Sequence, residues 1–548
     1  MRLFFVLLCG ASLPTWSQTW AWPGCSDVTD ANFAYTDLVR RGVAPDASLA
    51  EPIKMDFDRD AQGNVDIYFV ELRGNVKRYN AVTKTVTTLA TLPRWTGPYT
   101  SSGVTNLNEG ITGIVLDPQF KTNHFLYIHW SPANAIVFRI SRFTVSDNIL
   151  TAEKILLDIP AQRNACCHTG GGMAFDAYGD LWIGMGNNTD LSGGENQSIN
   201  EVDKYKSDEW GASSTAGLRG SILRVHPDNS TRGYAIPPGN FGEYFAQQTG
   251  NAQYNDTNKV KPEIYAKGTR NPYTLQLDPV RRWVMWGDIG PDRSLVHEEY
   301  NLSHHPGFYG WPYFAGNNLS FVGSKDPTAP TNTSKWNTGL GVLPPAITAI
   351  FPYAESAAIT GPIYRYDGDL TSTVKLPPHF TRKWFVTDWN NNQIRLFTLD
   401  SAGLTVIQNQ RIFANHSFSG ILDLKTGPDG ALYTINYGNA YYTSGPSTSI
   451  TKITYTGNCR PTDPKLEKAV GTYLNPNSRY VTQPKGWVVN LQSHRPVMVP
   501  IGMTGFQLFD LLGEKVWEIR KLHAGEEFVF PSDLPSGAMK YRWLPSGR

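Results

Sequence analysis

A short unit recurs six times along the chain: a turn rich in Asp, Pro and Gly, then a strand in which apolar and aromatic residues alternate. The turns supply the backbone dihedrals that a hairpin needs, and the strands have the length and composition of sheet strands. If each repeated strand is the innermost member of a four-stranded sheet, six units predict an all-β, six-bladed β-propeller. The units occupy 58–70, 116–128, 175–183, 277–286, 376–386 and 427–435.

The composition agrees with such a fold and excludes one class of partner. Of the 548 residues, 50 are Gly and 37 are Pro, and 12% are aromatic, a balance typical of short strands joined by tight turns. The 49 basic and 48 acidic residues give a formal net charge of +1, without the basic excess that attracts phosphates. We therefore expect no nucleic-acid partner.

Four segments are expected along the chain. Residues 1–21 place Arg2 before an apolar run, as in a cleaved secretory signal, and no later stretch is apolar enough to span a membrane. Residues 22–460 would form the propeller and 461–484 a linker. Residues 485–548 alternate strands and turns, which predicts a small C-terminal β-sandwich.

The cysteine count fits an oxidising compartment, because four cysteines, an even number, remain once the signal peptide is cleaved. Cys25 and Cys459 bracket the repeated region, so a bridge between them would staple the ends of the ring. Cys166 and Cys167 are adjacent and form either a vicinal disulfide or two reduced thiols. The chain contains no Cys-x-x-Cys-His sequence, which excludes a covalently attached haem of that type.

A histidine among glycines is the first candidate for chemistry. His168 stands two residues before a run of three glycines that leads into the strand of the third unit. We interpret the glycines as positions where a flat ligand could lie close to the backbone, while the strand fixes the imidazole. A lone histidine in a loop is more often structural than catalytic, so its neighbours must decide.

Two loops of the fourth unit supply such neighbours. Arg270 and Asn271 precede its strand, whereas Gly290 and Pro291 follow it. A propeller would bring both loops and His168 to one opening of the central channel. A base, a guanidinium, an amide and free carbonyls there suit oxidation of an alcohol, provided that a bound electron carrier accepts the hydride.

Each of these residues also has a structural interpretation. Arg270 could form an ordinary ion pair between blades, and Gly290 with Pro291 could form a plain turn. Glu298 and Glu299 follow in the same region, and we expect them to be solvated loop charges.

At these segments the chain resembles the glucose/sorbosone dehydrogenase family, the soluble sugar dehydrogenases that depend on pyrroloquinoline quinone (PQQ) and have a six-bladed propeller. The resemblance runs in order over about residues 51–457, and the order of its motifs is more specific than any one of them. The matching segments are 113–120, 139–143, 166–172, 218–225, 270–272, 290–291, 309–312 and 427–433.

The resemblance implies roles for individual residues. His168 matches the base that takes the proton of the sugar's anomeric hydroxyl as hydride passes to PQQ. His168, Arg270 and Asn271 match residues that contact the cofactor, and Arg270 is also expected to be catalytic by steadying the negative charge that develops beside it. Gly290 and Pro291 match the pair whose carbonyls bind a calcium ion that polarises PQQ. The implied activity is oxidation of an aldose to its lactone, with electrons passed to an external acceptor.

One departure from the family concerns the cofactor's carboxylates. Family members hold them with a lysine in the fifth blade and two arginines before the repeated strand of the sixth, whereas those regions here, 388–393 and 418–423, lack basic residues. Lys383, Arg395 or Lys425 could substitute. Otherwise PQQ binds weakly, or the chain is a carbohydrate- or protein-binding propeller that has lost the cofactor. A lactonase, which would need a calcium ion deeper in the channel, is a third alternative.

The C-terminal segment carries a separate resemblance. Segments 509–513 and 534–537 are similar to sorting domains of the type IX secretion system. This implies export to the cell surface, the periplasm or the medium of a Gram-negative bacterium. An accessory module that packs on the propeller or binds carbohydrate is the alternative.

Overall fold

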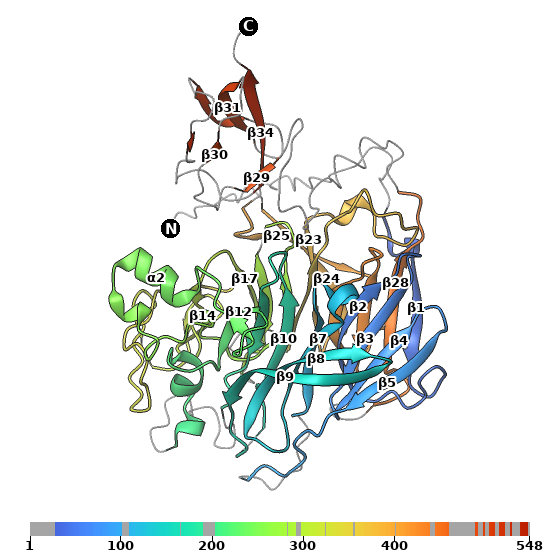
Figure 1. The fold of residues 1–548 in the computed structure, drawn as a ribbon, viewed down its shortest axis with the longest axis horizontal. Helices are drawn as coiled ribbons and strands as arrows, with labels where there is room; N and C mark the ends of the chain where they lie inside the picture. The colour runs from blue at the N-terminus through green and yellow to red at the C-terminus, as the bar shows by residue number, and fades with distance from the viewer. Residues whose placement is uncertain are drawn as a thin grey trace, which may run out of the picture.

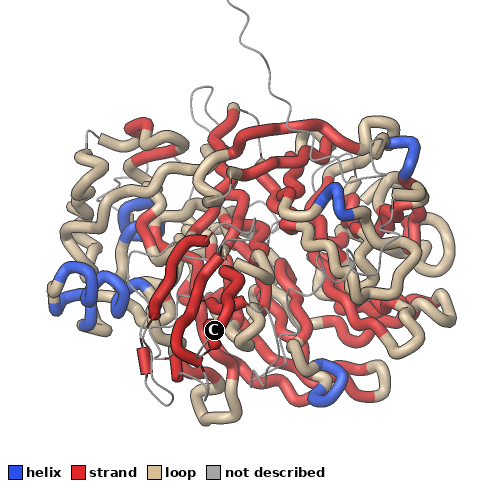
Figure 2. The backbone as a smooth tube through the Cα atoms, turned by 90° about the horizontal axis from the view of Figure 1, so that it is seen from above, coloured by secondary structure: helices blue, strands red, loops and turns tan. Residues whose placement is uncertain are grey.

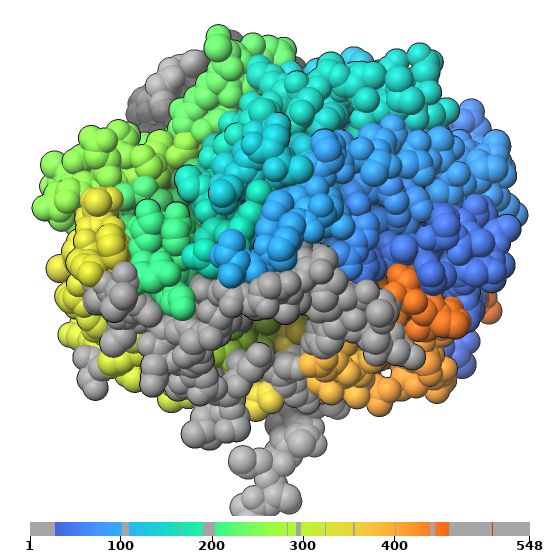
Figure 3. Space-filling view, turned by 90° about the horizontal axis from the view of Figure 1, so that it is seen from below, coloured from blue at the N-terminus to red at the C-terminus, as the bar shows by residue number. Residues whose placement is uncertain are grey.

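A computed structural model describes residues 28–459, apart from 101–108, 165, 190–202, 282, 292–297, 324, 355–356, 401 and 439–443, together with strands between 488 and 545. The described residues of 28–459 form six β-sheets arranged in a ring and one short two-stranded hairpin, and the ring confirms the predicted six-bladed propeller. Seen from below, the chain runs round the ring in sequence order (Figure 3). Helices are few and lie at the periphery (Figure 2).

In five blades the four strands nearest the channel follow one another in chain order, and the third blade also takes β18 from beyond β17 of the fourth blade. From the innermost strand outward, the first blade consists of β2 (Pro52–Arg59), β3 (Val65–Glu71), β4 (Asn75–Asn80) and β5 (Thr85–Thr91), and the second of β6 (Ile111–Leu116), β7 (Phe125–Trp130), β8 (Val137–Ser146) and β9 (Ile149–Pro160). The third consists of β10 (Gly170–Phe175), β11 (Leu181–Met185), β12 (Ser221–Pro227), β14 (Ile264–Lys267) and β18 (Gly307–Phe308), with β13 (Tyr234–Ala235) paired to β12. The fourth consists of β15 (Pro272–Leu277), β16 (Val284–Asp288), β17 (Glu298–Ser303) and β21 (Phe351–Tyr353), and the fifth of β22 (Ala358–Ile363), β23 (Lys383–Asp388), β24 (Gln393–Leu399) and β25 (Val406–Ile412).

The sixth blade closes the ring. It consists of β26 (Ile421–Thr426), β27 (Leu432–Asn436), β28 (Ser449–Tyr455) and, outermost, the N-terminal strand β1 (Phe33–Arg40). Strand β1 lies beside β28 (Figure 1), and their antiparallel register pairs Phe33 with Tyr455. Cys459 is disulfide-bonded, while Cys25, its expected partner, lies outside the described residues.

The remaining elements are short. They are the hairpin β19 (Phe314–Ala315) and β20 (Leu319–Ser320), the α-helices α1 (Phe120–Asn123) and α2 (Phe241–Thr249), a π-helix (Glu209–Ser213) and 3-10 turns at Asp30–Asn32, Lys204–Lys206, Ala252–Asn255 and Pro378–Phe380. None of the helices in the described residues is long and apolar enough to cross a membrane.

The C-terminal residues form two separate sheets. One has the order β29 (Val488–Asn490), β34 (Ala538–Pro545), β31 (Met503–Phe509) and β32 (Lys515–Arg520), and the other pairs β30 (Val497–Met498) with β33 (Glu527–Phe528). The strands are therefore present as expected. Their packing as a sandwich stays a prediction.

The position of the repeated strand within each blade was predicted wrongly. The repeated strands are β3, β7, β11, β16, β23 and β27, each second from the channel, and the innermost strand precedes the turn. In three of the six units the turn carboxylate accepts from an aromatic side chain on the second strand. Asp117 accepts from Tyr127 at 2.9 Å, and Asp429 accepts from Tyr433 at 2.9 Å. These aromatic side chains are almost fully buried between blades.

Candidate active site

The innermost strands all begin, and the second strands all end, at one opening of the channel, which we call the mouth. His168 precedes β10 at this opening, Arg270 and Asn271 precede β15, and Gly290 follows β16. Backbone hydrogen bonds join their loops, because Asn187 N donates to Arg270 O at 2.9 Å and Asn188 N donates to His168 O at 3.2 Å. The structure thus brings the predicted residues together.

The glycines beside His168 have a packing role that was not predicted. A Cβ on Gly171 would lie 2.4 Å from Thr112 O, in the blade before, and a Cβ on Gly172 would lie 2.6 Å from Leu275 N, in the blade after. They therefore permit close approach of neighbouring innermost strands, and close approach of a flat ligand stays a prediction. Cys166 and Cys167 form the vicinal disulfide, and both Cys167 and His168 have positive φ.

Two residues that the sequence did not single out orient the imidazole. Asn187, just after β11, donates from Nδ2 to Asp208 Oδ1 at 2.7 Å, so its Oδ1 acts as an acceptor toward His168 Nδ1, 2.8 Å away. His168 therefore carries its proton on Nδ1 and presents Nε2 as a lone pair. No donor or acceptor of the described residues reaches Nε2.

The protonation state of His168 follows from its surroundings. The residue is 7% exposed, and burial, followed by the nearby Arg270 guanidinium, lowers the pKa of His168 well below its ordinary value. The imidazole is consequently neutral at neutral pH, the form that a general base requires.

Asp288, at the end of β16, holds the arginine loop in place. Its carboxylate accepts from the backbone N–H groups of Arg270, at 2.9 and 3.1 Å, and of Asn271, at 2.5 Å. The Asn271 side chain in turn accepts from Gly170 N at 3.1 Å. Asn271 therefore ties the histidine loop to the arginine loop through its carbonyl oxygen.

The carbonyls expected to bind calcium are in contact with a different cation. Arg270 Nη1 donates to Ile289 O at 2.8 Å and to Gly290 O at 2.6 Å. The donor set is rich in oxygen, as Ca²⁺ prefers, but a guanidinium already fills the position beside Gly290 O. No group of three His, Cys, Asp or Glu side chains in the described residues is arranged to hold a metal ion.

Glu298 and Glu299 are not the solvated loop charges that were expected. They lie on β17 and are only 5% and 9% exposed. Glu298 accepts from Gly290 N at 3.0 Å and from Ala358 N at 2.9 Å, whereas Glu299 accepts from Gly316 N and from Asn301. Burial raises the pKa of Asp288 to about 6, of Glu298 to about 7 and of Glu299 to about 8.

These raised pKa values predict that stability falls as the pH rises. The unfolded chain releases these protons near pH ~4, whereas the folded chain holds them up to pH values of about 6, 7 and 8. The stabilisation that these three carboxyl groups give the folded state is complete below pH ~4, and it is lost as the pH rises through the folded-state pKa values of about 6, 7 and 8. Scanning calorimetry should show a falling Tm between pH ~5 and ~8, with a shallower fall in Glu299→Gln. A slope equal to that of a control at the exposed Glu243, Glu243→Gln, would contradict this assignment.

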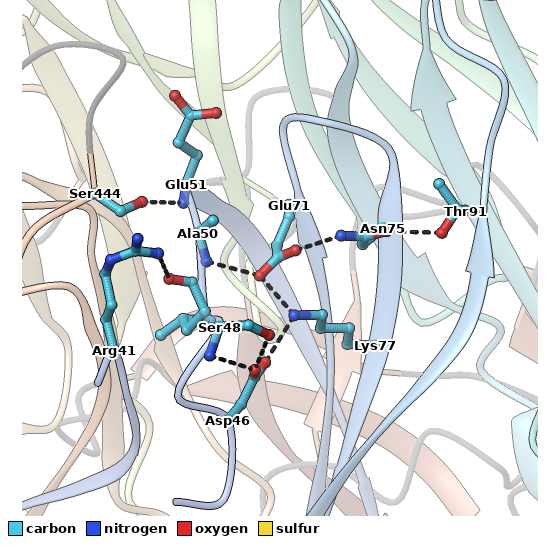
Figure 4. A network of polar contacts seen from close by, with 11 residues as sticks. Arg41, Asp46, Ser48, Ala50, Glu51, Glu71, Asn75, Lys77, Thr91 and Ser444 are labelled. Carbon is cyan, nitrogen blue, oxygen red and sulfur yellow. Dashed lines mark hydrogen bonds and ion pairs between the residues drawn. The ribbon is translucent and has the colours of Figure 1, made fainter. Parts of the chain in front are cut away.

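Cations elsewhere around the channel are mostly engaged in structural contacts. Lys77 lies between Asp46, at 2.7 Å, and Glu71, at 2.8 Å, in a buried network that braces the entry to β2 (Figure 4). Of the suggested substitutes for the carboxylate-binding cations, Lys383 starts β23 at the end away from the mouth. Arg395 donates to Asn409 on the outer strand β25.

Two lysines enter the channel itself. Lys54 Nζ donates to Leu422 O at 2.9 Å and lies 3.7 Å from the centroid of the Tyr273 ring, and burial lowers its pKa to about 7. Lys425 Nζ lies 4.0 Å from Asp56 Oδ1. Lys54 could not be recognised from the sequence, because an isolated lysine in a strand carries no motif.

Comparison with known proteins agrees with the architecture. The chain is 24% identical over 331 residues, 60% of its length, to the aldose sugar dehydrogenase YliI of Escherichia coli, covering 74% of that protein. Over 205 residues, 37% of its length, it is 28% identical to the HIPL1 protein of Arabidopsis thaliana, covering 27% of that protein.

Solved structures share the fold. A putative oxidoreductase (glucose dehydrogenase) of Thermus thermophilus has a TM-score of 0.52 at 19% identity, over 77% of this chain and 99% of that one. The apo form of the soluble aldose sugar dehydrogenase of E. coli has a TM-score of 0.51 at 19% identity, with the same coverage. The family model for glucose/sorbosone dehydrogenases matches residues 49–440. The chain thus belongs to the glucose/sorbosone dehydrogenase family.

Proposed function

We propose that this protein is a secreted, PQQ- and calcium-dependent dehydrogenase that oxidises the C1 hydroxyl of an aldose to the lactone. The observation that carries this proposal is the chain Asp208–Asn187–His168, which presents a neutral imidazole lone pair beside Arg270. Family membership and the likeness to a named aldose sugar dehydrogenase support the substrate class.

The protein's residues divide the reaction between them. His168 Nε2 takes the hydroxyl proton of the sugar, and Asn187 holds the ring in place while the proton arrives. Arg270 supplies positive charge to oxygen atoms that become more negative. PQQ, when bound, supplies the acceptor for the hydride that leaves C1, and an external acceptor then removes the two electrons.

Two measurements test the proposal. Calorimetric titration of the calcium-loaded protein with PQQ should give saturable binding, and the loaded protein should reduce an artificial dye when an aldose is added. Absence of both the binding and the dye reduction would refute the proposal.

Calcium bound at Gly290 and Pro291 would place a second cation beside the Gly290 carbonyl that already accepts from Arg270, and the two positive charges would repel each other. Calcium should therefore raise the Tm of Arg270→Gln more than that of the wild type. Saturation to about a hundred times Kd adds about 2.7 kcal/mol of stability. Equal shifts in both proteins would place the calcium ion elsewhere.

A binding propeller is the second candidate, favoured by one observation. Asp388 and Asp423 stand where the family places cations, and they are engaged by Tyr353 OH at 2.8 Å and Met55 N at 3.0 Å. A lactonase is less well supported. It would need a calcium ion deeper in the channel, where the ammonium groups of Lys54 and Lys425 lie.

The C-terminal residues 485–548 are proposed to be a sorting domain. Fusing them to a reporter protein and following its export would test this role.

A further inference from the structure

Arg219 is a buried guanidinium without a hydrogen-bond partner in the part of the chain that the structure describes. It precedes β12 at the mouth and is 6% exposed. Its guanidinium carbon lies 4.0 Å from the centroid of the Trp210 ring. Burial lowers the pKa of Arg219 to about 10. Buried arginines are normally paired, so a guanidinium that stacks on an indole ring and forms no hydrogen bond within the described residues indicates a place for a ligand.

A second cation lies on the same aromatic surface. Lys204 Nζ is 5.3 Å from the centroid of the Trp210 ring and 5.1 Å from that of Tyr205. In the described residues neither Lys204 nor Arg219 forms an ion pair with a carboxylate. Two such positive charges on one aromatic surface attract an anion, and the planar fork of Arg matches a carboxylate.

The backbone places this surface beside the candidate active site. Gly220 N, one residue after Arg219, donates to Gly186 O at 3.0 Å, and Gly220 O accepts from Thr269 N, next to Arg270, at 3.2 Å. Trp210 follows Asp208, the residue that fixes Asn187 and hence His168. Arg219 therefore stands between the histidine loop and the arginine loop.

We infer that Arg219, Trp210 and Lys204 form a carboxylate-binding subsite at the mouth of the propeller. The ligand's carboxylate accepts from the Arg219 fork, and Lys204 adds a second positive charge. The inference rests on the proposed function for the source of that carboxylate. It belongs either to the cofactor, whose usual cations are missing from blades five and six, or to an acidic sugar substrate.

Titration calorimetry on the full-length, calcium-loaded protein distinguishes the two sources. PQQ, glucose and glucuronate are titrated into the wild type, Arg219→Gln and Arg232→Gln. Arg232 is a matched control, because it stacks on Tyr234 at 4.1 Å but is paired with Glu263. Weaker PQQ binding in Arg219→Gln alone, by about tenfold to a hundredfold, assigns the subsite to the cofactor. Weaker glucuronate binding with unchanged glucose binding assigns it to the substrate.

The other outcomes are also decisive. Unchanged affinities in Arg219→Gln, or a wild type that binds neither PQQ nor glucuronate, overturn the subsite. Glucuronate binding that depends on Arg219, without PQQ binding or dye reduction, keeps the subsite and refutes the dehydrogenase. If PQQ binds equally well to the wild type and to Arg219→Gln, the proposed dehydrogenase stands, but its cofactor does not use the subsite. If Arg219→Gln does not fold, Arg219→Lys and Lys204→Gln decide the question by the same comparison.

Discussion

Replacing His168 with glutamine is expected to lower kcat by about a hundredfold to ten-thousandfold, the usual contribution of a positioned general base. Glutamine keeps a polar side chain that can still bind Asn187, but it has no basic nitrogen at the position of Nε2. The affinity for PQQ should change little, because the loop is held by Asn271 and by the backbone of Asn188. Dye-reduction kinetics with calorimetry of PQQ binding separates the two effects.

His226→Gln is the matched control for this experiment. That imidazole lies on β12 of the same blade and contacts Asp180 at 2.9 Å, but it sits at the end of the strand away from the mouth. Its loss should leave kcat unchanged. A His168→Gln protein that retains full turnover and a normal Tm would exclude His168 as the base, whereas a wild type that binds ligand without turnover, with an affinity unchanged in His168→Gln, would favour the binding propeller.

The sequence allowed the ring to be predicted, because its turns and strands obey local rules. Asp117 and Asp429 each bind an aromatic side chain a few residues later, so the repeat is a local signal. The depth of the strand in the blade is set by pairing across the sheet instead. Period and composition are the same for a first and a second strand that are both buried, so the pattern could not separate them.

The candidate site was predicted only in part, for a related reason. His168, Arg270 and Asn271 stand within two residues of a glycine or proline in loops with a recognisable order, whereas Asn187 and Asp208 act through contacts between distant segments. Glu298 and Glu299 are charged in a loop-like sequence, yet backbone N–H groups of Ala358 and Gly316, distant in sequence, hold them in the interior. The position of Asn187 just after a second strand, like that of Asp288, is a signal that could have identified it.

Replacing Gly186 with alanine should damage the candidate site without touching any polar side chain. An added Cβ would lie 1.9 Å from His168 O and 2.9 Å from Gly170 N, both backbone atoms, so the histidine loop must move. Overpacking of this kind costs about 1–3 kcal/mol of stability. A displacement of the base by ~1 Å lowers turnover about a hundredfold.

Gly341→Ala isolates the effect of position from that of the substitution. A Cβ at Gly341 has no neighbour within 4 Å, so its Tm and kcat should match those of the wild type. In Gly186→Ala we expect a lower Tm together with a lower kcat, measured by calorimetry and dye reduction. A lower Tm with full turnover would mean that the His168 backbone position does not control proton transfer. The base would then have to be sought among other groups at the mouth, of which Glu298, with a pKa of about 7, is the first to test.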